Sequence, residues 1–161
     1  MTSHRREDMR LTLFVAFLML TVPALVWGLP LSEKETIGVV RNSGGIATVT
    51  RGEQVFQAAA GTKLLAGDTL STGPDGTLGV ILRDNSVLSL GPGSRLVVLR
   101  FLFSPADGKL GLLARFSKGT LAYISGLIGK LAPESVRFET PVASIGIRGT
   151  YFAVKVEEPA S

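Results

Sequence analysis

Apolar and polar residues alternate in short runs along most of the chain, the pattern of strands with one buried and one exposed face. The clearest run is 77–82, where leucine or valine stands at every second position, and 87–90 repeats it after a turn. Residues 101–103 and 110–116 are nearly all apolar, so we expect these two strands to be buried on both faces. The pattern predicts an all-β protein.

Turn-forming residues separate the runs at short intervals, which leaves room for strands and almost none for helices. The strongest turn signals are Gly44-Gly45, Pro74-Asp75-Gly76, Asp84-Asn85-Ser86, Gly91-Pro92-Gly93 and Asp107-Gly108. Residues 57–66 contain three alanines, but Gly61 interrupts them too soon for a stable helix, and we expect strand or loop there.

The topology stays open at this point. A glycine precedes Thr-Leu at three expected strand starts, within residues 67–70, 76–78 and 119–121. Solenoids repeat in this way, although the period here is irregular. A β-sandwich fits recurrent short strands equally well.

The most informative string lies near the C-terminus, from Thr140 to Val154. Pro141 fixes its own φ and favours an extended Thr140, and residues 142–148 then alternate between a polar and an apolar face. Gly149 permits a bulge or bend. After it, Tyr151, Ala153 and Lys155 are expected to oppose Phe152, Val154 and Val156.

The N-terminal region has a different composition. Residues 11–32 carry no charge and follow Arg5, Arg6 and Arg10, the layout of a secretory signal or a single membrane anchor. We predict a signal peptide or anchor over 1–28 and a linker over 29–36, and favour cleavage over retention. The remainder is then exported or secreted, or held at the membrane by residues 11–27 if they are retained.

Composition excludes several classes of function. The chain has no cysteine, and its single histidine, His4, lies in the predicted targeting segment. Disulfides, thiolate chemistry and imidazole catalysis are therefore not expected in the remainder. Without residues 1–28 the chain loses three of its 17 basic and two of its 13 acidic residues, which leaves a scattered net charge of +3. Such a charge does not indicate nucleic-acid binding.

No catalytic constellation stands out in the sequence. Asp68, Asp75, Asp84 and Asp107 lie in turn sequences, where aspartate binds nearby backbone more often than substrate. Ser117-Lys118 and the pair Ser125 and Lys130 lack a nucleophile context. Residues 126–130 resemble the end of a phosphate-binding loop without its hydroxyl residue. We expect no enzymatic activity, no cofactor and no metal.

Three stretches resemble the FecR-type domain, a periplasmic module named after regulators of iron-uptake signalling in Gram-negative bacteria. Residues 61–76 are similar to its glycine, leucine, Gly-Asp and Thr-Gly pattern, and 82–94 to its Asp-Gly-Ser turn, with Asn85 in place of the usual glycine. Residues 140–152 resemble its closing Thr-Pro to Arg-Gly-Thr signature. The resemblance spans about residues 37–156 and leaves 157–161 as a tail.

The resemblance implies a compact, solenoid-like stack of short strands, with a β-sandwich as the alternative, and a binding or sensing role without catalysis. Signalling members have a cytoplasmic anti-sigma domain before the membrane helix and a receptor-docking segment after the module. Only about ten residues precede Leu11, and the chain stops at Ser161, so we expect it to be closer to exported members without those parts.

Two functional hypotheses follow. The first is an exported module that contacts an envelope protein or a cell-wall polymer through a face or an open strand edge. The second is a membrane-anchored regulator in FecR-type sigma-factor or iron-uptake signalling, which requires an uncleaved anchor; only then is the inner membrane a partner. The candidate interaction or structural residues are Arg148, Gly149, Thr150, Tyr151 and Asp68. For Arg148 we favour an internal ion pair with Asp68 or Glu139.

Overall fold

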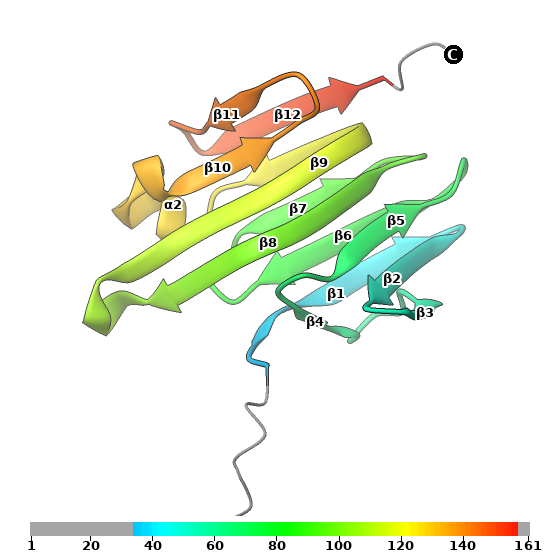
Figure 1. Cartoon of the computed structure of the whole chain (residues 1–161), viewed down its shortest axis with the longest axis horizontal. Helices are drawn as coiled ribbons and strands as arrows, with labels where there is room; N and C mark the ends of the chain where they lie inside the picture. The colour runs from blue at the N-terminus through cyan, green and yellow to red at the C-terminus, as the bar shows by residue number, and fades with distance from the viewer. Residues whose placement is uncertain (1–33, 158–161) are drawn as a thin grey trace, which may run out of the picture. The chain divides into compact units, whose positions relative to one another are not determined.

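The computed structural model describes residues 34–157, which form an almost entirely β structure (Figure 1). Strands make up 60% and helices 9% of it, which confirms the predicted all-β class. The predicted signal or anchor, most of the predicted linker and residues 158–161 lie outside the described residues. Among the residues described, no helix is long and apolar enough to cross a membrane.

The strands of the described region form one 12-stranded sheet that curls into a half-barrel. They are β1 Thr36–Gly44, β2 Ala47–Arg51, β3 Gln54–Gln57, β4 Lys63–Leu65, β5 Thr69–Thr72, β6 Thr77–Leu82, β7 Val87–Leu90, β8 Arg95–Ser104, β9 Lys109–Ile124, β10 Val136–Glu139, β11 Ser144–Gly146 and β12 Tyr151–Val156. Three short helical segments complete it: α2 Leu127–Leu131 and the 3-10 turns η1 Pro105–Asp107 and η2 Pro133–Ser135.

The main path of the sheet runs β3-β2-β5-β8-β9-β7-β6-β1-β4. Off this path, β10 and β12 both pair with β9, and β11 adds to β10. Among the described strands only β10 and β9 pair in parallel, and every other pair is antiparallel. The C-terminal strands therefore extend the curled sheet beyond β9 (Figure 1).

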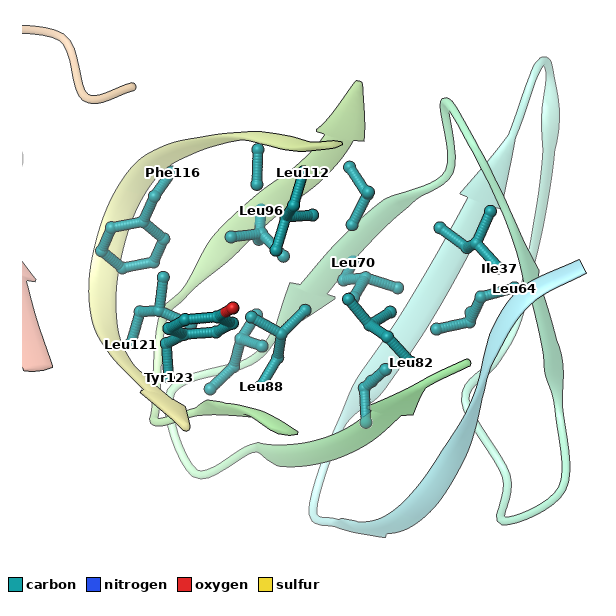
Figure 2. Packing of buried hydrophobic residues seen from close by; sticks show 14 of the residues in the cluster. Ile37, Leu64, Leu70, Leu82, Leu88, Leu96, Leu112, Phe116, Leu121 and Tyr123 are labelled. Carbon is teal, nitrogen blue, oxygen red and sulfur yellow. The ribbon is translucent and has the colours of Figure 1, made fainter. Parts of the chain in front are cut away.

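The 16-residue strand β9 produces much of the curl. Its first part pairs with β8 and β10, and its second part with β7 and β12. Gly119, between the two parts, has φ +96°, and a Cβ there would collide with Ser94. Glycine thus allows the strand to bend, and Figure 2 shows β9 curving so that Phe116 and Tyr123 lie inside the same core.

The core fills the inside of the curl with residues from alternate positions of the strands (Figure 2). The pattern expected for residues 77–90 is confirmed, since Leu78, Val80, Leu82, Leu88 and Leu90 are all buried. Each fully buried leucine contributes roughly 2 kcal/mol through removal of apolar surface from water. With no cysteine in the chain, this core is the main source of stability.

The expectation of strands buried on both faces is wrong for β8 and β9. Leu102 is 42% exposed beside a buried Phe101, and Arg115 is exposed between the buried Ala114 and Phe116. One face of each strand points to solvent. Residues 101–103 are all apolar because apolar residues occupy the solvent-facing side of the strand as well as the inward-facing side. Residues 57–66 are a loop followed by β4, as expected.

The C-terminal string divides into two strands. Thr140 closes a tight turn, in which its Oγ1 accepts the N–H of Ala143 (3.0 Å), and the strand expected over 142–148 is reduced to β11. The expected alternation in β12 is confirmed: Phe152, Val154 and Val156 are half-buried, whereas the residues between them are exposed.

Candidate interaction surface

The tight turn Asp84-Asn85-Ser86 joins β6 to β7, with Asp84 and Ser86 fully buried and Asn85 exposed. Asn85 has φ +65°, a left-handed conformation that asparagine tolerates better than most residues other than glycine. The Asp84 carboxylate accepts the N–H of Ser86 through Oδ1 (3.0 Å) and its hydroxyl through Oδ2 (2.7 Å). This geometry explains why asparagine can stand at the position where glycine is usual.

The same turn holds the start of α2 in place. The Asp84 carbonyl oxygen accepts the N–H of Leu127 (2.7 Å), and Asp84 Oδ2 accepts the N–H of Ile128 (3.2 Å). The N–H of Gly126 donates to Ser86 Oγ (3.0 Å), and a Cβ on Gly126 would collide with the Asp84 carbonyl. A helix of five residues is not stable alone, so its position depends on this turn.

Tyr123 extends the polar cluster into the core. Its hydroxyl lies 3.1 Å from Ser86 Oγ, and because Ser86 donates to Asp84, Tyr123 donates to Ser86. Burial raises the pKa of Tyr123 above its ordinary value. No buried side-chain nitrogen or oxygen of the described residues lacks a hydrogen-bond partner. The cluster is therefore complete without a ligand, and its chemistry is that of a structural network.

The C-terminal signature meets this network through Ser125. Its backbone N–H donates to the carbonyl oxygen of Thr150 (2.9 Å), which fixes the segment before β12 beside α2. A surface depression of about 460 Å³ lies between these segments. Its lining, called the signature depression below, comprises Ser125, Gly129, Lys130, Pro133, Glu134, Arg148, Gly149 and Thr150.

Charged side chains surround the signature depression. Arg148, Lys130 and Glu134 are all exposed, and none of them forms an ion pair within residues 34–157. Ser125 is almost fully buried at its wall. Three consecutive residues singled out in the sequence, Arg148 to Thr150, line the signature depression. Tyr151 follows them as the exposed first residue of β12.

The expectation of an internal ion pair for Arg148 is wrong. Both of its expected partners, Asp68 and Glu139, bind other arginines. Arg51 donates two hydrogen bonds to Asp68, from Nε to Oδ1 (2.9 Å) and from Nη2 to Oδ2 (2.7 Å). Arg115 Nη2 binds Glu139 Oε2 at 3.0 Å. Asp68 also accepts the N–H of Leu65 (2.8 Å), so it stabilises the turn before β5 and does not line the signature depression.

The sequence did not identify Lys130, Glu134 or Gly129 as neighbours of the signature. They come from α2 and η2, and only the fold brings these segments beside Arg148. A usable signal was the presence of Gly126 just before a short apolar helix and of Gly129 within it, since both glycines allow close packing. The described residues contain no group of three or more His, Cys, Asp or Glu side chains that could hold a metal ion.

The chain matches a known protein family. A family model described as FecR protein matches residues 68–161, more than half of the chain. No curated protein and no solved structure matches it. The matched segment begins just before β5, yet β1 pairs with β6 along its length, so the sheet also contains strands outside the match. The matched family is an envelope-associated signalling family that is not known as enzymatic. By this match the chain belongs to the FecR family.

Proposed function

We propose that this chain is an exported, non-enzymatic binding module of the bacterial cell envelope, which contacts a protein or cell-wall partner at the signature depression. One observation carries the proposal. Arg148 is exposed and forms no internal ion pair in the described region, although it belongs to the Arg-Gly-Thr string that resembles the closing signature of the family. An exposed arginine without an internal partner is available to an external one.

The chemistry of the depression suits polar ligand groups. Arg148 and Lys130 offer cationic donors, and Glu134 offers an acceptor at the same rim. The wall is preorganised, because Ser125 is bonded to Thr150 and Gly129 packs against Ser125. A peptide, which carries carboxylate, amide and ammonium groups, matches this mixture of charges.

Catalysis by the same residues lacks support. Ser125 and Lys130 both line the depression, but no hydrogen bond joins them, and Lys130 is exposed rather than desolvated. The described residues include no histidine. Acid, base and nucleophile are not assembled together, so a binding role is the better proposal.

The test uses the full-length chain in cells, with a photo-crosslinking amino acid at position 148 or 150. A matched control carries it at Gln57, which is exposed on the edge strand β3. We expect discrete adducts from 148 and 150 and none from 57, in either the protein fraction or the sedimented cell wall. Equal labelling from all three positions, or none from 148 and 150, would contradict the proposed site.

The anchored regulator is a second candidate, favoured by the signalling character of the family and by the uncharged residues 11–32. It requires that the N-terminal segment stays attached. N-terminal sequencing of the protein isolated from cells separates the two candidates: a start at Met1 supports the regulator, and a mature start near Leu25 or Leu29 overturns it.

A further inference from the structure

An apolar row crosses the outer face of the sheet over five neighbouring strands. Successive Cα partners are Val39 and Ile81, Ile81 and Val87, Val87 and Ile124, and Ile124 and Tyr151. Val39 is 39%, Ile124 44% and Tyr151 66% exposed, and the two residues between are half-buried. Solvent-facing positions of a sheet are normally polar, so this row, called the outer row below, requires an explanation.

The outer row faces away from the core. Its residues alternate along their strands with Leu82, Leu88, Tyr123 and Phe152, which point inward. No described helix packs on it, since α2 covers the core side through Ile128. The face is therefore open to a partner.

A second row of small residues lies beside the outer row. Ser89 pairs with Ala122, and Ala122 with Ala153, each two residues along its strand from Val87, Ile124 and Tyr151 respectively. Two residues of a strand correspond to about 7 Å, and both rows lie on the same face. The strands β7, β9 and β12 thus carry a ridge of large side chains next to a step of small ones, with β9 between the other two (Figure 1).

We propose that this face binds a second copy of the same chain. A two-fold axis that runs parallel to the two rows and midway between them places each large residue of one copy on a small residue of the other. Tyr151 then lies on Ala153 of the second copy, Ile124 on Ala122, and Val87 on Ser89, and the reverse contacts follow by symmetry. This is the self-complementarity that a two-fold interface requires.

The row of small residues is the reason to propose a second copy of the chain, and not a membrane, as the partner of this face. A lipid surface accepts protruding apolar residues but gains nothing from a row of small residues with the same strand-to-strand spacing. Two sheets that pack face to face approach to about 10 Å, and interlocking large and small side chains fill that space. Charged residues near this face include Lys63 opposite Val39, Arg83 two residues beyond Ile81, and Lys155 on β12, and they fall at its rim, where interfaces are polar.

This dimer goes beyond the proposed binding role and does not depend on it. The signature depression and the outer row adjoin at Ser125 and Ile124 and at Thr150 and Tyr151, but they use different side chains. Loss of the dimer and loss of the external partner are therefore separable by mutation.

The first test measures the mass of the purified full-length chain by sedimentation over a concentration series. We expect a dimer for the wild type, and a dissociation constant raised about tenfold or more for Ile124→Glu and for Ala153→Arg. The matched control is Val55→Glu, which alters a 64% exposed apolar residue on β3 and should leave the dimer intact. A monomeric wild type, or a dimer unaffected by both outer-face variants, overturns the proposal.

The second test uses the absence of cysteine from the chain. The variants Y151C and A153C are mixed and oxidised, and we expect a mixed disulfide dimer in larger amount than either variant forms alone, because residue 151 of one copy faces residue 153 of the other. Equal yields from the mixture and from each single variant contradict this packing. The thermal melting of each variant shows whether it is folded.

Discussion

The side chain of Asp84 binds the backbone N–H of Ile128 across 44 residues of sequence, with an Oδ2 to N distance of 3.2 Å. The carboxylate belongs to the turn between β6 and β7, and the N–H belongs to the first turn of α2. Because α2 forms one wall of the signature depression, a turn motif far away in the sequence determines the shape of the candidate site.

Replacement of Asp84 by Ala should destabilise the protein by roughly 3 kcal/mol, since three buried donors, the Ser86 and Ile128 N–H groups and the Ser86 hydroxyl, lose their acceptor. Denaturant unfolding of the full-length chain measures this. The control is Asp75→Ala, at an exposed turn position whose side chain makes no hydrogen bond among the described residues. Equal stability of the two variants would show that the network contributes little.

Tyr123 gives the fold a dependence on alkaline pH. Burial raises its pKa above the ordinary value of 10.0, so the folded state holds the proton more tightly than the unfolded chain. The resulting stabilisation is fully present below pH 10 and is lost as the pH rises through the folded pKa. We expect the unfolding free energy of the wild type to fall more steeply above pH 10 than that of Tyr123→Phe. Parallel curves for the two proteins would contradict this effect.

Arg148→Ala should leave the unfolding free energy within about 0.5 kcal/mol of the wild type, because the side chain is exposed and forms no ion pair in the described region. Gly149→Ala should cost about 1 kcal/mol or more, since Gly149 has φ +151°, which side chains rarely adopt. Thermal melting of both variants checks the pair. A strongly destabilised Arg148→Ala would restore an internal role for this arginine.

The sequence predicts the strands well and their partners poorly. The alternation in β6, β7 and β12 is local information, set by which side chains avoid water, and it is confirmed residue by residue. The ion pairs depend on the curl of the sheet, and the local sequence pattern carries no information about that curl. Asp68 has a suitable arginine only 17 residues away, in Arg51, and Arg115 and Glu139 meet because β10 runs parallel to β9.

The outer face illustrates the same limit. Ile81 lies on the opposite face of β6 from Leu78, Val80 and Leu82, as the alternation over 77–82 predicts. Its place in an apolar row becomes evident only from the strand register, which aligns Ile81 with Val87 and Ile124 of other strands. A single apolar residue on a solvent face is ordinary, whereas five in a row are not.

The contact between Gly129 and Ser125 can be tested by a double-mutant cycle. A Cβ on Gly129 would collide with Ser125 Oγ, so Gly129→Ala should displace α2 and cost about 2 kcal/mol. In a Ser125→Ala background the hydroxyl is gone, while the backbone bond from residue 125 to Thr150 remains. There the same substitution should cost less than about 1 kcal/mol, because alanine also favours the helix over glycine. Denaturant unfolding of the four proteins gives the interaction energy. An equal cost in both backgrounds would show that α2 adapts without pressing on Ser125, and that the wall of the signature depression is not held by this contact.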